Sequence, residues 1–193
     1  MTKGDGSMAG KLKPIRRVVT GDDAQGRSRV LFDSAAPNVN PQAVRPGSGM
    51  TDIWVYHECP AVISGDRDDG NLPFHFEPAA RGGHLRIVHG GARPPDYDPA
   101  KDTAKVPLHA PVKGHGGTWE RGGQNAYSSR IHKTETVDYG ILLAGERTLI
   151  LDDGEYVMQP GDVVVQVGNW HGWSNPRAPS LMAFVMMAAT FED

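Results

Sequence analysis

The clearest indications of the fold lie in residues 131–146, IHKTETVDYGILLAGE, and residues 160–175, PGDVVVQVGNWHGWSN. Each stretch contains a short run of aliphatic or β-branched residues, 141–143 in the first and 163–167 in the second, next to Gly, Pro or Asp. Short apolar runs between turn-forming residues are typical of β-strands. Both stretches therefore predict strands with polar side chains, among them two histidines, close by.

Similar runs recur along the whole chain, at residues 30–32, 53–57, 85–88, 148–151 and 181–188. No window of about a dozen residues carries the 3.6-residue apolar period of a helix. The 24 Gly and 15 Pro belong to a chain that turns often, and Asp-Gly within residues 152–155 is a tight-hairpin signal. Residues 160–162 predict a second turn. We therefore expect an all-β fold, either a sandwich or a barrel.

Composition restricts the class of protein. The chain has 193 residues, a net charge of −3 and one cysteine, Cys59, so an internal disulfide is excluded and no basic footprint suggests a nucleic-acid partner. No apolar run approaches the 18 or so residues of a membrane span, and the first residues lack a signal-peptide pattern. We expect a cytoplasmic protein with neither a nucleic-acid nor a membrane partner.

The pattern along the chain indicates one domain over residues 14–193 after a flexible tail, residues 1–13. Residues 64–82 form an acidic loop. Residues 90–125 hold seven Gly and five Pro, too many for a regular element. A connection of this length is commonly a lid over a site, and the alternatives are a surface excursion or a dimer contact.

A first group of polar residues has a regular spacing. His132 and Thr134 are two apart, Asp138 follows after three residues, and Gly145 after six more. Period-2 alternation places His132 and Thr134 on one face of a strand.

A second group lies 16 to 30 residues further on. Four residues separate Gly161 from Gln166, Gly168 follows, and His171 and Asn175 complete the group. Together the two motifs closely resemble those of the cupin superfamily, in particular its small bacterial single-barrel members of the cupin type-2 group. The resemblance extends over roughly residues 80–193. It implies a double-stranded β-helix, the jelly-roll barrel of cupins, with residues 14–62 as an N-terminal strand extension that adds to the sheets or crosses to a second subunit.

The resemblance also implies a divalent metal in the barrel mouth. It carries three ligand positions over to His132, Asp138 and His171, whereas Thr134 stands where the family has a second histidine. Two imidazoles and one carboxylate suit Fe, Zn, Mn or Ni. The alternative is a barrel without metal, in which Asp138 and His171 act as a general acid and base.

Three further residues are candidates for the substrate pocket. Thr134 shares the strand face of His132, and Trp173 shares that of His171, where it could equally belong to the core. Gln166 replaces the family proline within an apolar run. It either lines the cavity or lies on a solvated face of its strand.

Other histidines could restore the missing ligand, although a single histidine is more often a surface or hydrogen-bonded side chain. These histidines are His57, His75, His84, His89, His109 and His115.

The leading prediction is a small-molecule cupin enzyme acting on a small oxygenated organic compound by oxygenase, isomerase, cyclase, decarboxylase or lyase chemistry. The alternative is a cupin that binds or senses a ligand without turnover. The resemblance also implies a homodimer, and exposed strand edges favour such pairing.

Overall fold

The structure is a computed structural model that describes residues 12–42, 47–63, 65–114 and 116–192. Nearly all of the predicted tail therefore lies outside the described residues. The regular elements are strands: β1 (Arg16–Asp22), β2 (Ser28–Ala35), β3 (Asn38–Pro41), β4 (Gly49–Tyr56), β5 (Gly83–Gly90), β6 (Val112–Lys113), β7 (Trp119–Glu120), β8 (His132–Lys133), β9 (Thr136–Gly145), β10 (Arg147–Ile150), β11 (Glu155–Met158), β12 (Val163–Val167), β13 (Gly172–Ser174) and β14 (Ser180–Ala188). The all-β prediction is confirmed.

One large antiparallel sheet forms a wall of the molecule, with the strand order β12-β9-β14-β5-β4-β3. Its inner face follows the period of two, so that Leu142 and Met182 are fully buried while Leu143, the neighbour of Leu142, is exposed. Strands β3 and β4 come from the N-terminal extension and widen this sheet beyond the predicted 80–193 core.

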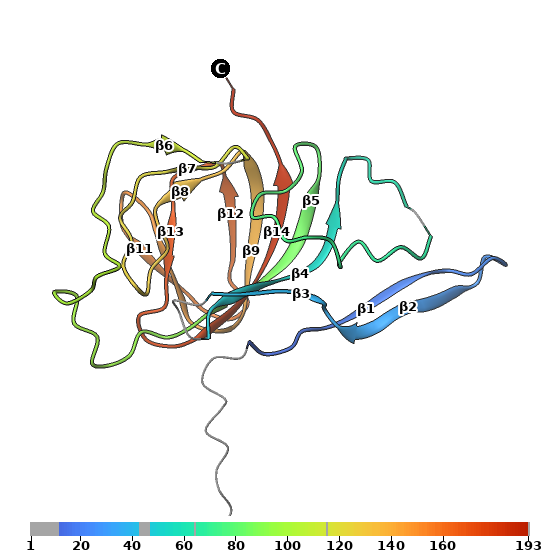
Figure 1. The fold of residues 1–193 in the computed structure, drawn as a ribbon, viewed down its shortest axis with the longest axis horizontal. Helices are drawn as coiled ribbons and strands as arrows, with labels where there is room; N and C mark the ends of the chain where they lie inside the picture. The colour runs from blue at the N-terminus through green and yellow to red at the C-terminus, as the bar shows by residue number, and fades with distance from the viewer. Residues whose placement is uncertain (1–11, 43–46, 64, 115, 193) are drawn as a thin grey trace, which may run out of the picture.

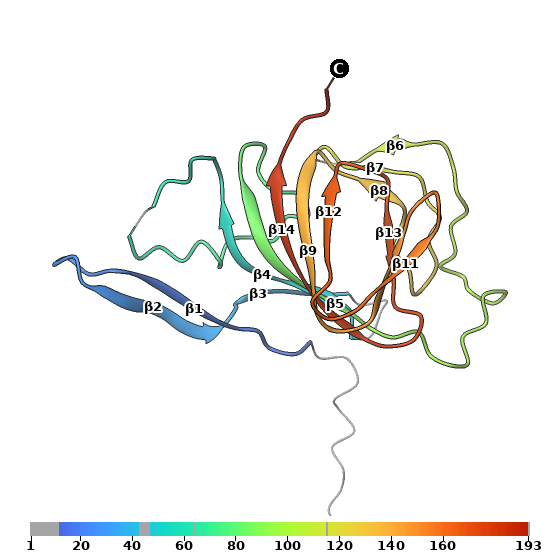
Figure 2. The ribbon, with the colours of Figure 1, turned by 180° about the vertical axis from the view of Figure 1, so that it is seen from behind.

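Two small sheets, β11-β10-β13 and β6-β7-β8, lie across from the large sheet. Figures 1 and 2 show β11 and β13 on one side and β9, β14, β5 and β4 on the other. A buried apolar cluster joins the two walls; it consists of Leu142, Leu149, Met158, Trp173, Met182, Phe184 and Met186. The fold is thus the double-sheet jelly roll that the motifs predict.

Turn residues close the barrel where the sequence places them. The hairpin between β10 and β11 uses residues 151–154, and Gly161 with Asp162 precedes β12. Gly145 has a φ of +76°, and an added Cβ there would meet the Pro179 carbonyl oxygen at 1.8 Å. This spacing requires glycine at the motif position.

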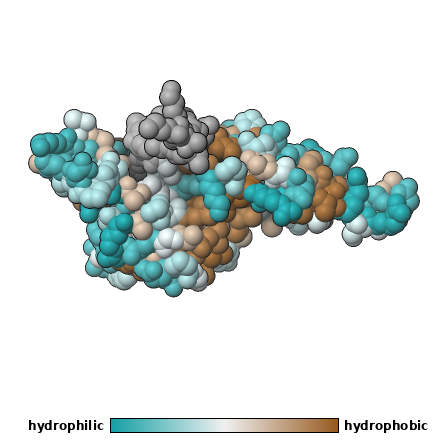
Figure 3. Space-filling view, turned by 90° about the horizontal axis from the view of Figure 1, so that it is seen from below, coloured by the Kyte–Doolittle hydropathy of each residue, from teal (hydrophilic) through white to brown (hydrophobic). Residues whose placement is uncertain are grey.

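The hairpin β1–β2 extends away from the barrel (Figures 1 and 2). Its base is anchored by the buried Arg17 guanidinium, which donates to the carboxylate of Asp68 and to the main-chain oxygen of Ile53. Seen from below, apolar residues gather near the middle of the molecule and hydrophilic residues predominate at both ends (Figure 3). None of the described residues belongs to a helix that could cross a bilayer.

The predicted insert, residues 90–125, is not wholly irregular. It contains the two-residue strands β6 and β7, and β7 pairs with β8. The expectation that this segment has no regular element was therefore wrong. Two-residue strands carry no apolar period, which is why the sequence pattern does not reveal them.

Candidate functional site

A cavity of about 770 Å³ lies inside the barrel. Both walls contribute to it, and its lining mixes aromatic residues with buried polar ones. The polar lining residues considered below are Arg86, His132, Thr134, Asp138, Arg147, Gln166 and His171. The predicted site residues therefore all face one space, together with Trp173.

His132 and His171 lie side by side in the small-sheet wall. Their main chains form an isolated antiparallel bridge, in which each N–H donates to the other residue's carbonyl oxygen at 2.9 Å. Opposed residues of such a pair present their side chains on the same face. The two imidazole ring centroids are accordingly 4.4 Å apart.

The hydrogen bonds of the two rings define their tautomers. Nδ1 of His132 lies 2.9 Å from the Arg130 carbonyl oxygen, and Nδ1 of His171 lies 3.0 Å from that of Asn169. A carbonyl only accepts, so each Nδ1 carries the proton and each Nε2 keeps its lone pair. Burial lowers the pKa of His171 to about 3, with the neighbouring His132 as a smaller cause, and burial also lowers the pKa of His132. Both imidazoles are therefore neutral at pH 7.

Asp138 lies on the inner face of β9 and is 4% exposed. The Thr136 hydroxyl donates to its carboxylate, and the buried Thr134 hydroxyl lies 2.6 Å from that of Thr136. Burial raises the pKa of Asp138 to about 6, against the lowering effect of Thr136. Its Oδ1 has no hydrogen-bond partner within the described part of the chain.

Gln166 lines the cavity and is 2% exposed, so it lies on the cavity face of β12 and not on a solvated one. It is the direct cross-strand partner of Asp138. Trp173 belongs to the core cluster and also lines the cavity, so it is both a core residue and a pocket residue. Its ring packs edge-on against His171 on one side and Phe184 on the other.

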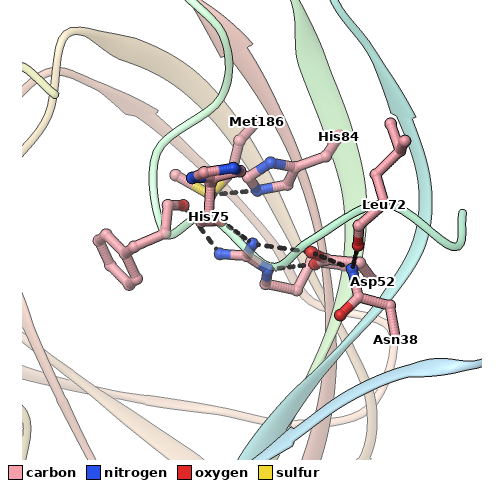
Figure 4. Close-up of polar contacts among 8 residues, drawn as sticks. Asn38, Asp52, Leu72, His75, His84 and Met186 are labelled. Atoms are coloured by element: carbon pink, nitrogen blue, oxygen red, sulfur yellow. Dashed lines mark hydrogen bonds and ion pairs between the residues drawn. The ribbon is translucent and has the colours of Figure 1, made fainter. Parts of the chain in front are cut away.

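The opposite wall is held by a buried ion pair, which Figure 4 shows around Asp52. The Nε of Arg86 donates to Asp52 Oδ1 at 2.5 Å, and its Nη1 donates to the Phe76 carbonyl oxygen at 2.8 Å. The Phe76 ring in turn packs edge-on against His132, with centroids 6.0 Å apart. Arg86 thus ties the segment before β5 to the histidine wall.

The three predicted metal ligands are not all assembled as a metal site. Among the residues that the structure describes, no group of three or more His, Cys, Asp and Glu side chains is arranged to hold a metal ion. The two histidines are adjacent, whereas Asp138 belongs to the large sheet, beside Gln166 and Met186.

The further histidines do not complete the set. His57, His75 and His109 are exposed, and His115 lies outside the described residues. His84 is buried with its Nε2 3.2 Å from Met186 Sδ, as Figure 4 shows. His89 lines the cavity, and its Nε2 has no partner among the described residues.

The predicted lid segment contributes to the cavity wall. Gly114, Thr118, Glu120 and Gln124 line the cavity, and Glu120 pairs across strands with His132. This arrangement places the segment beside the histidines. Its role as a lid stays a prediction.

Arg86 and Arg147 are lining residues that sequence reasoning missed. Arg86 interrupts the apolar run of β5, and Arg147 opens β10 with its guanidinium 5.1 Å from the centre of the Trp173 ring. A charged residue within a buried strand is rare unless it is paired. An arginine within an apolar strand sequence is therefore a signal by which the sequence indicates a paired or functional residue.

Comparisons with known proteins link the chain to fungal cupins. It is 45% identical over 64 residues to phomopsin biosynthesis cluster protein C' of Diaporthe leptostromiformis, covering 32% of this chain and 34% of that protein. It is 48% identical over 64 residues to a cupin-domain-containing oxidoreductase of Hypocrea virens, covering 31% and 33%. The match to a similarly named protein of Aspergillus ruber is 36% over 64 residues, covering 31% and 32%. The matches thus span about a third of each relative.

Two solved structures show a weaker likeness. An ethanolamine utilization protein of Salmonella typhimurium covers 92% of this chain and 99% of its own, at 10% identity and a TM-score of 0.40. A cupin-superfamily sugar phosphate isomerase of Silicibacter pomeroyi covers 55% and 51%, at 20% identity and a TM-score of 0.31. These TM-scores are too low to support any functional statement.

No protein-family model matches the chain. The curated relatives are fungal, so they do not support the bacterial subgroup that the motifs suggest. The two spaced motifs, the matches to proteins named for a cupin domain and the all-β jelly-roll fold agree with one another. The chain is a member of the cupin superfamily.

Proposed function

We propose that this protein is a small-molecule enzyme whose substrate, a small oxygenated organic compound, binds in the barrel cavity. The observation that carries the proposal is the pair of neutral imidazoles, His132 and His171, which face a 770 Å³ cavity with both Nδ1 atoms bonded to main-chain carbonyls. A cavity of this size suits a drug-sized molecule. The names of the fungal oxidoreductases, which share a third of their length with this chain, support an enzyme over a binding protein.

The donor chemistry of the histidine pair fits a divalent first-row metal ion. Metal-binding histidines commonly donate their second ring N–H to a main-chain carbonyl, as both rings do here. His132 and His171 would hold the ion, with its remaining positions left to water and substrate. Bound there, the ion would act as a Lewis acid toward a substrate oxygen.

Asp138 is proposed as the general acid or base. A catalytic group works best with a pKa near the working pH, and burial brings the Asp138 carboxyl to about 6. Asp138 lines the cavity and its Oδ1 has no partner within the described chain, so this carboxyl is free to accept a proton from a bound compound or return one. The hydroxyl chain Thr134–Thr136 orients the other carboxylate oxygen.

Metal content after expression in medium supplied with Fe, Mn, Zn and Ni tests the histidine pair. We expect close to one ion per wild-type chain and a large loss in His171→Ala. The exposed His109→Ala serves as the matched control and should retain the metal. Equal content in wild type and His171→Ala would rule out this site.

Turnover is tested separately. A first screen selects small hydroxylated aromatic compounds and carboxylates that raise the melting temperature of the protein. Each selected compound is then incubated with wild type and with Asp138→Asn, and the product masses are compared. We expect a new product with wild type and a rate reduced about 100-fold or more in Asp138→Asn. Compounds that bind to wild type and are never converted would favour the ligand-binding alternative.

A further inference from the structure

We propose that Gln166, together with Asp138, recognises a substrate group that carries hydrogen-bond donors next to an acceptor oxygen, such as a primary amide or a hydroxyl beside a carbonyl. The inference rests on the proposed binding of a small organic compound in the cavity. It assigns to Gln166 a specificity-determining role at that site.

The amide of Gln166 is buried and unpartnered. The residue is 2% exposed, it lines the cavity, and neither its Oε1 nor its Nε2 has a hydrogen-bond partner within the described residues. Most buried polar side chains have a partner, because an unmade hydrogen bond costs free energy. An amide with both atoms unpartnered, on a side chain that lines a cavity, therefore points to a ligand that supplies the missing bonds.

Asp138 lies directly opposite Gln166, since the two are cross-strand partners on β9 and β12. Residues paired in this way have Cβ atoms about 5 Å apart, so their polar atoms are within reach of one ligand group. Asp138 Oδ1 is also buried without a partner in the described chain. The two side chains together offer two acceptors, Oδ1 and Oε1, and one donor, Nε2.

The complementary group has donor hydrogens and an acceptor oxygen on neighbouring atoms. A primary amide meets this description with its N–H hydrogens and its carbonyl oxygen. The surrounding lining is apolar on the adjacent strand, where Met186 and Phe184 face the same cavity. This lining favours a substrate that is aromatic or otherwise apolar and carries its polar group at one end.

The matched probes are benzamide and acetophenone, which have nearly the same shape. Benzamide offers N–H donors beside the carbonyl, whereas acetophenone has a methyl group in their place. A site built to bond a donor rejects an analogue that lacks it. Titration calorimetry on the wild-type protein should show benzamide binding at least about tenfold more tightly than acetophenone.

Gln166→Met keeps the length of the side chain and removes its hydrogen-bonding atoms. We expect it to weaken benzamide binding about tenfold and acetophenone binding less, because the ketone loses only the hydrogen bond from Nε2 to its carbonyl oxygen. Because the amide has no partner to lose among the residues that the structure describes, the urea midpoint of unfolding should stay constant or rise. A purely structural glutamine would give a lower midpoint. Val157→Thr, at an exposed residue of β11 in the other wall, is the control and should change neither quantity.

Three results would overturn the inference: a lower urea midpoint in Gln166→Met, equal benzamide affinity in this variant and wild type, or wild-type binding of benzamide no tighter than that of acetophenone. These measurements need neither metal nor turnover. They therefore stay informative if the proposed metal site or the proposed catalysis is disproved.

Discussion

The buried imidazole of His84 makes the fold sensitive to acid. Its side chain is 2% exposed, and burial, with the charge of Arg86 as a smaller cause, lowers its pKa to about 3. In the unfolded chain the same group titrates near 6.5. Between these values the unfolded state binds a proton that the folded state does not. The contribution of His84 to the free energy of unfolding is therefore fully present above pH 6.5 and is lost as pH falls toward 3.

Replacing this residue should remove that part of the pH dependence. Wild type should lose about 1.4 kcal/mol per pH unit through His84 below pH 6.5. His84→Leu lacks a titrating group, so its free energy of unfolding should fall less steeply from pH 6.5 to pH 4.5. Urea denaturation at pH 8, 6 and 4.5 measures both slopes. Parallel curves for the two proteins would contradict the assignment.

At the scale of elements, the Asp52–Arg86 pair joins β4 to β5 and holds the segment that precedes β5. Both side chains are at most 2% exposed, and Arg86 also donates to the carbonyl oxygens of His75 and Phe76. The guanidinium lies 4.4 Å from the centre of the Phe74 ring. Burying two charges is favourable only with such complete hydrogen bonding.

Removing one residue of the pair should lower the free energy of unfolding more than removing both. Arg86→Met leaves the Asp52 carboxylate buried without its cation, and we expect a loss of about 3–5 kcal/mol in the free energy of unfolding. The double variant Asp52→Leu/Arg86→Met should recover a large part of this loss. Chemical denaturation of the wild type, both single variants and the double variant measures the coupling. Additive losses would show that the pair does not act as a unit.

At the scale of the whole molecule, the outer face of the large sheet exposes apolar side chains. Tyr139 and Leu143 on β9 and Val163, Val165 and Val167 on the edge strand β12 are 40–71% exposed. Contiguous exposed apolar surface commonly marks an interface, and an edge strand offers unpaired main-chain groups. The expected homodimer is therefore proposed to form through this face.

A charge placed on this face should separate the two copies. Val165→Glu should shift the protein from dimer to monomer in size-exclusion chromatography with light scattering, because a desolvated carboxylate disfavours the interface. Val157→Glu on β11, similarly exposed but in the other wall, is the control and should remain a dimer. A monomeric wild type, or an unchanged Val165→Glu dimer, would disprove this interface.

Local sequence alone specifies the all-β fold and the strand over residues 163–167. These features follow from local chemistry, namely β-branched residues between turn-forming ones. The need for glycine at position 145 arises from the Pro179 carbonyl oxygen, which only the tertiary structure brings close. The motif spacing also predicted that His132 and His171 share one site, and both residues line the cavity. Strands β1, β3 and β11 were missed because their residues are mostly exposed and carry little apolar alternation.

Which polar residues lie together depends instead on how the sheets pair and pack. Local alternation shows which face of a strand a residue occupies, but strand order and register determine what stands opposite it. The register of β9 against β12 placed Asp138 beside Gln166 and not with the histidines, and the pairing of β4 with β5 placed Arg86 against Asp52, 34 residues away. Register depends on the packing of whole sheets and on bulges such as that at Leu181, which no local stretch of sequence specifies.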